Sequence, residues 1–463
     1  MTQEDIITPI ATVDTRQCMI TSPWFVQNTE YSPMPATYKP LVNGEEAFAA
    51  VYHAIMNAQK TVDIICWGFQ PSMYFIRDGQ SLCIGELLCK IAETKKVQVR
   101  ILGWEMPCNA AGGGGEANLP GKGVIRYKDR KGQSTTDERY AYDRQWFRQY
   151  SLSGEWSDHQ LKKGQAGIAE IAAAPIAQRQ EKLSSLSQAQ AGKHDIETLY
   201  LQAVNNATQF IYIENQYFRW PPLAELINQV AERQSKVGRE LHLFVVTNVT
   251  DEGIGAGTVN TQRMLEVLGR ANIIPEVTKL RKIGQLSNAM FGGSVGYIDP
   301  GDTNKRNREM SEKIADFKKK ADEIQSSEIL PEERPGLKVH ICSLVAPDSP
   351  PEEWMPVYIH SKLMIVNDVF TTHGSANINT RSMQVDSEMN IAHEWASVTR
   401  DLRRRLWNMH TNGRGGQDEA KDAFKAWGYL INTNEKLQGT GKDRPEAPLI
   451  KFLYNKSTLS DLD

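Results

Sequence analysis

The chain lacks a long apolar run and a surplus of basic residues. No stretch approaches the ~20 apolar residues that cross a bilayer, and Met1–Asp5 shows neither the basic nor the apolar region of a signal peptide. Lys and Arg number 53 against 56 Asp and Glu, which gives a net charge of -3. This balance argues against a broad nucleic-acid surface, although a local basic cleft stays open. Any membrane would therefore be reached from solution.

Paired cysteines are also missing. The six cysteines are scattered, and only Cys83 and Cys89 stand close together, in an apolar context without a nearby histidine pattern. This arrangement favours reduced core thiols over a disulfide framework or a zinc site. The sequence thus predicts no metal and no cofactor.

A faint internal repeat is present in the 463 residues. Residues 54–69 and 203–218 share Ala, Asn, Ile and Phe at equivalent places, and each reads as a helix end running into a strand. A helical stretch and a second strand follow in both copies, at 97–102 and 241–246. The order predicts an α/β fold with two lobes.

The run Val357–Val366 carries the strongest chemical signal, His360-Ser361-Lys362. Alternating and β-branched residues predict a buried strand, on which His360 and Lys362 would project from one face. An imidazole can attack phosphorus while an ammonium neutralises the phosphate oxygens. The pair predicts a phosphodiester-cleaving site that needs no metal. An isolated H-x-K is more often an ordinary strand edge, so the surrounding residues decide.

Segment 357–394 resembles the second catalytic motif of the phospholipase D superfamily, in which H-x-K is followed by a G-S-x-x-N block and an acidic residue. The resemblance implies that His360 is nucleophile or general acid and that Glu388 orients its ring. It implies phosphate binding by Lys362 and by Asn377 or Asn379. Gly374 and Ser375 complete the block, Ser375 as a further substrate-binding residue, and the run 402–410 matches the helix that follows it.

One position departs from the motif. The family has an aspartate five residues after the lysine, where this chain has Asn367, with Asp368 next along. Successive strand residues face opposite sides, so Asp368 replaces that aspartate only through a bulge. Asn367 can accept a hydrogen bond as a substrate-binding residue but supplies no negative charge to a protonated imidazole.

The family's first H-x-K motif has no counterpart. The interval before residue 195 offers only His159-Gln-Leu-Lys162, whose spacing is H-x-x-K and whose continuation reads as a polar loop entering a helix. The predicted division is an amino-terminal lobe at 1–165 without its motif, an Ala- and Gln-rich helical linker at 166–195, and a carboxy-terminal lobe at 196–463 with the catalytic motif. The resemblance implies that each lobe is a mixed β-sheet flanked by helices and that the first lobe is incomplete. Gly112–Gly115 reads as a loop.

Two further segments leave alternatives open. Residues 304–324 predict a charged helix with Met310, Ile314, Phe317 and Ile324 along one stripe, which favours a packing helix over a membrane-surface helix. Phe218 and Trp220 follow a predicted strand and either line an entrance for acyl chains or belong to the core.

Segments 22–30, 66–73, 101–105 and 213–218 resemble the phospholipase-D-type lipase effectors of bacterial type VI secretion. This resemblance implies delivery without a signal peptide into the periplasm of a target cell, membrane phospholipids as substrate, and a delivery protein and an immunity protein as partners. A chain with one motif would be slow, since losing acid-base help costs about 10² to 10⁴ in rate. A homodimer would restore the second histidine.

Three functions stay open. The first is a phosphodiesterase that releases phospholipid headgroups through a phosphohistidine. The second is an impaired relative that binds phospholipid or a delivery partner without turnover. The third is a nuclease, against which the acidic pI near 6.4 and the lack of interleaved basic and aromatic residues argue.

Overall fold

The computed structural model describes residues 22–27, 29, 33–66, 68–103, 119–122, 136–150, 194–249, 257–292, 303–386 and 388–460. The chain forms two compact units. The amino-terminal unit comprises residues 34–191 and 252–255, and the carboxy-terminal unit comprises residues 1–33, 192–251 and 256–463. The H-x-x-K at 159–162, the glycine loop at 112–115 and all but the last two residues of the linker at 166–195 lie outside the described residues.

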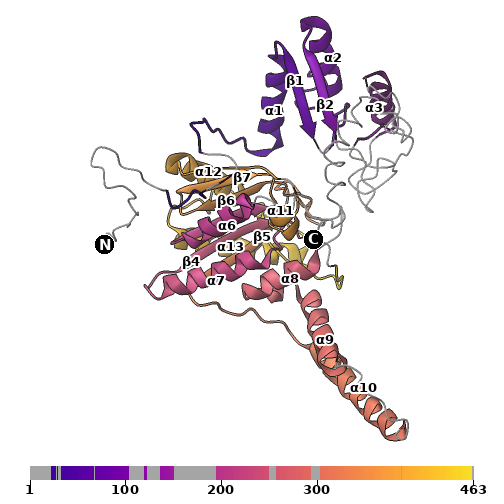
Figure 1. Ribbon diagram of the computed structural model, residues 1–463, viewed down its shortest axis with the longest axis vertical. Helices are drawn as coiled ribbons and strands as arrows, with labels where there is room; N and C mark the ends of the chain where they lie inside the picture. The colour runs from indigo at the N-terminus through magenta and orange to yellow at the C-terminus, as the bar shows by residue number, and fades with distance from the viewer. Residues whose placement is uncertain are drawn as a thin grey trace. The chain divides into compact units, whose positions relative to one another are not determined.

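The described part of the amino-terminal unit is a helix–strand–helix–strand arrangement followed by one more helix (Figure 1). Its strands β1 and β2 pair in parallel, Thr61 with Gln98 through Cys66 with Gly103. Side chains from both flanking helices and from α3 bury a small core around Leu87 and Trp146. The elements are α1 (Asn43–Met56), β1 (Thr61–Cys66), α2 (Ile84–Lys95), β2 (Gln98–Gly103) and α3 (Asp137–Tyr150).

The carboxy-terminal unit is built on one mixed sheet with the strand order β8-β7-β6-β3-β4-β5-β9. Strands β3, β4 and β5 run parallel. Strand β6 pairs antiparallel with β3, β7 and β8 continue antiparallel beyond it, and β9 closes the other edge antiparallel to β5. The strands are β3 (Phe210–Asn215), β4 (Leu241–Thr247), β5 (Leu337–Leu344), β6 (Lys362–Val366), β7 (Phe370–Gly374), β8 (Asn390–His393) and β9 (Leu449–Lys451).

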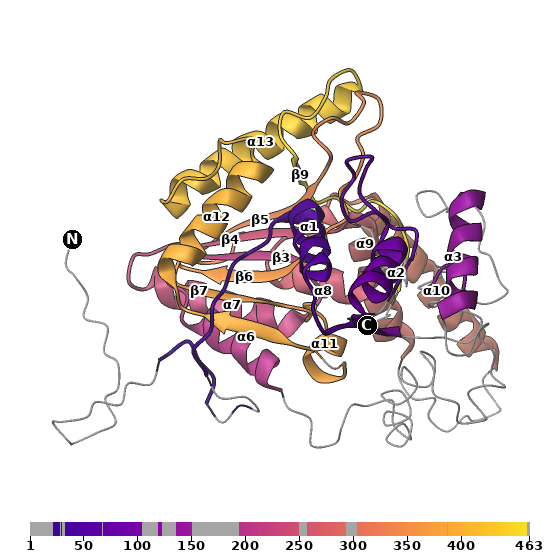
Figure 2. The same cartoon turned by 90° about the horizontal axis from the view of Figure 1, so that it is seen from above.

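Helices cover both faces of this sheet (Figure 2). Alternate side chains of β3 and β4 point to opposite faces of the sheet, and because helices cover both faces these strands are buried throughout. Phe210, Tyr212 and Phe244 contact Trp407 of α12, and Tyr212 and Phe244 also contact Trp427 of α13. The helices are α6 (Asp195–Asn205), α7 (Pro221–Ser235), α8 (Thr258–Val267), α9 (Pro275–Phe291), α10 (Thr303–Ser326), α11 (Thr380–Gln384), α12 (Ala396–His410) and α13 (Ala420–Thr440), with a 3-10 turn at Ala271–Ile273.

The predicted α/β class and the predicted repeat are confirmed. Both copies run helix–strand–helix–strand, and the two strands of each copy pair in parallel. The mixed sheet predicted for each lobe is found in the carboxy-terminal unit, whereas the described sheet of the amino-terminal unit is parallel.

The predicted charged helix is present as α10, which packs on α9 with Phe317 against Phe291 at 5.6 Å between ring centroids. Met310 and Ile314 of the same stripe stay exposed. Phe218 and Trp220 are only 3% and 2% exposed and belong to the core, which selects one of the two predicted roles.

Candidate active site

The predicted site residues gather at one edge of the large sheet, with one exception. Lys362 opens β6 and pairs with Asn215, the last residue of β3, because the two strands run antiparallel. Strand β7 ends at Gly374, opposite Asn390 at the start of β8. The edge therefore collects the segments before β6 and β8 and the segments after β3 and β7. His360, Ser375, Asn377 and Glu388 all lie on these segments.

The strand predicted over 357–366 is shorter than expected. Strand β6 begins at Lys362, so His360 lies two residues before it and the period-two argument does not apply to His360. The two residues are joined instead by a hydrogen bond from Lys362 Nζ to the carbonyl oxygen of His360, at 2.7 Å. A local bond thus keeps the pair together where the sheet ladder has not yet begun.

Lys362 is buried, only 5% exposed, and its ammonium also donates to Oε1 of Gln216 at 2.9 Å. Burial lowers the pKa of Lys362 to about 8, although the nearby Glu388 carboxylate opposes the change. The ammonium is thus still charged at neutral pH. A fixed ammonium of this kind can stabilise the negative charge that builds on the oxygens of a phosphodiester.

His360 is exposed as a residue, but neighbouring groups shield part of its ring from water. This desolvation, with the charge of Lys362 added, lowers the pKa of His360 to about 4. The imidazole is therefore neutral at pH 7, as a nucleophile must be. The ring of Tyr358 stacks on it at 6.3 Å between centroids, with 27° between the planes.

Glu388 binds two hydroxyl groups. Ser375 Oγ donates to Oε2 at 2.6 Å and Ser382 Oγ donates to Oε1 at 2.7 Å. Burial nevertheless raises the pKa of this carboxyl. Within the described part of the chain no hydrogen bond joins Glu388 to the His360 ring, so the orienting role implied for Glu388 stays a prediction.

The two asparagines of the block differ in their surroundings. Asn379 is buried, and its Oδ1 accepts from the backbone N–H of Ser382 at 3.1 Å, so it caps α11. Asn377 Oδ1 is buried and has no hydrogen-bond partner among the described residues. A buried acceptor without a partner is costly, and a substrate or a water molecule would satisfy it.

Asn367 is the exception, because it lies at the other end of β6. Five residues separate it from Lys362, which is ~16 Å along a strand. Its Oδ1 accepts from the backbone N–H groups of Thr208, Gln209 and Phe210 at 3.0–3.2 Å. The substrate-binding role predicted for Asn367 and its predicted effect on the His360 charge therefore lack a geometric basis. Asn367 shapes a turn.

Glycine is required at position 374. A Cβ there would lie 2.2 Å from both Oδ1 of Asn390 and the carbonyl oxygen of Met389. The close approach lets Ser375 exchange hydrogen bonds with Met389 and brings Ser375 Oγ to Glu388. The Gly-Ser pair of the motif thus follows from packing between β7 and β8.

Sequence reasoning missed the residues that support the site. Gln216 binds Lys362, and Asn215 Oδ1 accepts from the backbone N–H groups of Tyr217 and Ile378, both at 3.1 Å. Asn248 accepts from the Ile359 N–H at 2.8 Å and so holds the segment before His360. The segment 213–218 carries a family resemblance, but only the pairing of β3 with β6 brings it to Lys362.

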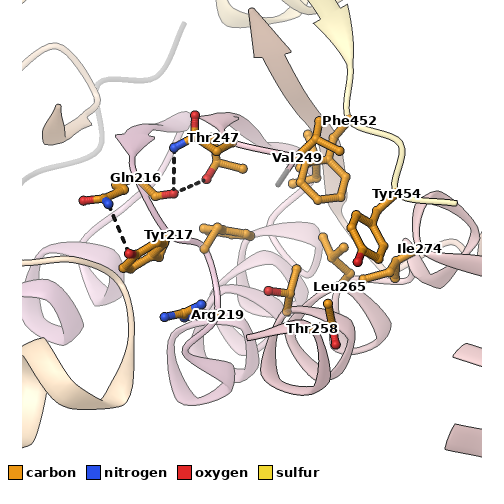
Figure 3. A pocket seen from close by; sticks show the side chains of 14 residues that line it. Gln216, Tyr217, Arg219, Thr247, Val249, Thr258, Leu265, Ile274, Phe452 and Tyr454 are labelled. Carbon is orange, nitrogen blue, oxygen red and sulfur yellow. Dashed lines mark hydrogen bonds between the residues drawn. The ribbon is translucent and has the colours of Figure 1, made fainter. Parts of the chain in front are cut away.

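A pocket opens beside Gln216 and encloses about 480 Å³, including its mouth (Figure 3). Gln216, Tyr217, Arg219 and Asn248 give it polar walls, and Phe452 and Tyr454 belong to its apolar side. It lies beyond the carboxyl ends of β3 and β4, where open α/β sheets place their ligands.

No cluster of three or more metal-ligating side chains occurs among the residues that the structure describes. Of the described helices, none is both long enough and apolar enough to traverse a bilayer. Cys66, Cys83, Cys89 and Cys342 are free thiols.

Residues 200–410 match the family model described as "Cardiolipin synthase, PLD-like domain". Phospholipase D delta of Arabidopsis thaliana is 26% identical over 236 residues, which cover 48% of this chain and 26% of that protein. Phospholipase D alpha 3 of the same plant is 28% identical over 221 residues, covering 43% of this chain and 24% of that protein. The match thus spans about a quarter of each relative's own length.

Solved structures give more distant similarities. Phosphatidylserine synthase of Haemophilus influenzae Rd KW20 is 10% identical with a TM-score of 0.38, covering 86% of this chain and 90% of that one. NucT from Helicobacter pylori is 12% identical with a TM-score of 0.24, covering 46% and 87%. The family model thus identifies a phospholipase D-like domain in residues 200–410, the part of the chain that carries His360 and Lys362, and this domain relates the chain to the phospholipase D superfamily.

Proposed function

We propose that the chain is a phospholipase D-type phosphodiesterase that releases headgroups from glycerophospholipids. The observation that carries the proposal is the pair at the start of β6, a neutral imidazole at His360 beside the fixed ammonium of Lys362. The imidazole can attack phosphorus and the ammonium can stabilise the charge that builds on the phosphate oxygens. The Arabidopsis relatives, named as phospholipases D, support this substrate class.

The proposed reaction has two steps. A ring nitrogen of His360 forms a bond to phosphorus while the bond from phosphorus to the headgroup oxygen breaks, and the departing alcohol takes up a proton. Water then gives its oxygen to phosphorus, the P–N bond breaks, and phosphatidic acid leaves. Of the nine histidines in the sequence, only His360 is followed by a lysine two residues later. The proton then comes from a second acid outside an H-x-K motif, from His360 of a second copy, or from solvent, and the last source is slow.

The test is headgroup release from vesicles of mixed phosphatidylcholine, phosphatidylethanolamine and phosphatidylglycerol, without added metal. We expect slow release by the full chain and none by His360→Ala. Mass spectrometry of the enzyme quenched in acid-free buffer should find a phosphatidyl adduct on His360. Release that persists in His360→Ala would overturn the assignment of the nucleophile.

A second function rests on the single H-x-K motif, which favours a relative that binds phospholipid or a delivery partner without turnover. Vesicle co-sedimentation separates the two. Binding by both the wild type and His360→Ala, with no headgroup released by either folded protein, would support the binding protein.

We further propose, from the resemblance of segments 22–30, 66–73, 101–105 and 213–218, that the protein acts as a type VI secretion effector in the periplasm of rival bacteria. A cognate immunity protein and a delivery protein would be its partners. The test is growth of a bacterial host that exports the chain to its periplasm or keeps it in the cytoplasm. Growth arrest only on export, and only with His360 present, is expected. Equal growth in all cases would contradict the effector role.

A further inference from the structure

The ammonium of Lys362 is held by two neutral acceptors. Its Nζ donates to Gln216 Oε1 at 2.9 Å and to the His360 carbonyl oxygen at 2.7 Å. An ammonium has three protons, so these two bonds leave one for a phosphate oxygen. Because both acceptors are neutral, they fix the direction of the ammonium without forming an ion pair with it.

The orientation of the Gln216 amide follows from the chemistry of its partners. An ammonium only donates, so the amide oxygen must face Lys362 and the NH₂ group must face the other way. There Nε2 donates to the hydroxyl oxygen of Tyr358 at 2.8 Å and to that of Tyr217 at 3.1 Å. The side chain of Gln216 is thus fixed at both ends of its amide.

The backbone of Gln216 is fixed as well. Its carbonyl oxygen accepts from Asn248 Nδ2 at 3.2 Å and from Thr247 Oγ1 at 3.4 Å (Figure 3). Asn248 also bonds to both backbone groups of Ile359, the residue before His360. The segment after β3 and the segment before β6 are therefore tied together around the site.

A third connection reaches the nucleophile. Tyr358, whose hydroxyl accepts from Gln216, stacks its ring on that of His360 at 6.3 Å. One amide thus contacts the charge-stabilising residue directly and the ring that packs on the nucleophile. We propose that Gln216 is a positioning residue that aligns Lys362, and through Tyr358 also His360, for attack on the phosphodiester. The inference rests on the proposed phosphodiesterase function.

Several titratable groups lie near Lys362 and influence its protonation. Among the described residues, Glu388 is the charged group that raises the pKa of Lys362 and so favours its ammonium form. His360 lies two residues before Lys362, and its pKa is lowered by the Lys362 charge. The phenols of Tyr217 and Tyr358 face Gln216. Glu214 of β3 is engaged by His410 Nε2 at 2.8 Å. A carboxylate in place of the Gln216 amide would add a negative charge directly on the ammonium.

Two substitutions at Gln216 separate positioning from simple packing. Gln216→Met keeps the length of the side chain and removes both amide groups, and we expect kcat to fall about 10- to 100-fold with a smaller change in KM. Gln216→Glu keeps the acceptor and adds charge, so the alkaline fall in kcat should move to higher pH. The matched control is Gln234→Met, which removes another buried amide, one that bonds to the Ala207 carbonyl oxygen at 3.3 Å.

A second readout does not depend on turnover. The rate at which acetic anhydride modifies Lys362 of the full chain, followed against pH by mass spectrometry, reports its protonation directly. Gln216→Glu should shift this curve to higher pH, while Gln234→Met should leave it in place. A wild-type kcat and an unshifted acetylation curve in both Gln216 variants would overturn the inference. If the acetylation curve shifts but the chain shows no turnover, the Gln216–Lys362 contact is supported and the phosphodiesterase function is rejected.

Discussion

At the scale of single residues, the site places two titrating groups in the forms that phosphoryl transfer requires. Desolvation and the charge of Lys362 keep His360 neutral, and burial lowers the pKa of Lys362 without removing its charge at pH 7. The two pKa values, about 4 and about 8, stand on either side of neutrality. Together they define a pH range in which nucleophile and ammonium are both competent.

The first prediction is a bell-shaped pH profile for phosphodiester cleavage. Attack needs unprotonated His360, so the rate should rise as pH passes about 4. Charge stabilisation needs protonated Lys362, so the rate should fall as pH passes about 8. Initial rates with a soluble phosphodiester between pH 3 and pH 10 would measure both limbs. Lys362→Arg, which stays charged throughout, should lose the alkaline fall. An unchanged alkaline limb in that variant would show that another group controls it.

Asn367 illustrates a residue that the motif places near the chemistry and the structure does not. Its φ of 54° lies in the left-handed region, which Asn tolerates better than most residues. Its amide oxygen accepts from three successive backbone N–H groups, and its Nδ2 donates to Thr208 Oγ1 at 3.1 Å. An aspartate could accept the same three bonds, so the departure from the family's residue alters little in this turn.

The second prediction separates stability from activity at this position. Asn367→Ala should lower the free energy of unfolding by about 2–4 kcal/mol, because three backbone donors lose their acceptor. Asn367→Asp should lower the free energy of unfolding much less. It should keep kcat/KM within about twofold, since the turn lies far from Lys362. Urea unfolding and initial rates would measure the two effects. A large loss of activity in a stable Asn367→Asp protein would return this residue to the active site.

At the scale of elements, helix α12 clamps the turn that joins β6 to β7. Arg403 of α12 is fully buried and donates to both carboxylate oxygens of Asp368, at 2.7 and 2.8 Å. Asp368 follows Asn367 in the turn and is 7% exposed. The guanidinium also donates to the Gln417 carbonyl oxygen and to Asp418. The helix predicted from the run 402–410 thus helps to fix the strand that begins with Lys362.

The third prediction concerns this buried pair. Arg403→Met should lower the free energy of unfolding by about 3–5 kcal/mol, because Asp368 would lose both hydrogen bonds from its buried partner. It would keep only the longer ion pair with Arg400, at 3.7 Å. The matched control is Arg404→Ala on the same helix, where an exposed side chain pairs with Asp418. That change should leave the urea midpoint nearly unmoved. Equal effects of the two substitutions would mean that Asp368 is solvated in solution.

Local patterns predicted the elements better than the contacts between them. The repeat of helix and strand and the strand near Lys362 follow from short-range periodicity, and the helix over 402–410 is implied by the family resemblance. Gln216 could not be predicted in this way, because 146 residues separate it from Lys362 and only the antiparallel pairing of β3 with β6 brings them together. Strand β6 starts later than predicted because residues 357–361 have strand-like side chains but form no sheet ladder: Val357 N–H bonds to the Leu344 carbonyl oxygen of β5, and the Ile359 backbone bonds to the Asn248 side chain.

At the scale of the whole molecule, the single motif raises the question of whether one chain or two chains form an active site. The sequence supplies one H-x-K motif, whereas the resemblance to the phospholipase D superfamily implies two histidines on opposite sides of the phosphate. Each chain also carries a second helix–strand–helix–strand unit, α1–β1–α2–β2. Because a second unit with the same order of elements is already present in each chain, we expect each chain to act alone and slowly.

The fourth prediction tests this expectation by mixing. Wild type and His360→Ala, combined at constant total concentration and allowed to exchange, should give a rate that falls linearly with the wild-type fraction. Paired histidines from two copies would instead make the rate fall with the square of that fraction, because only dimers with two wild-type chains would work. Light scattering on the same mixtures gives the oligomeric state. A quadratic fall together with a dimer would show that His360 of a second chain supplies the leaving-group proton, and that the missing motif is replaced by assembly.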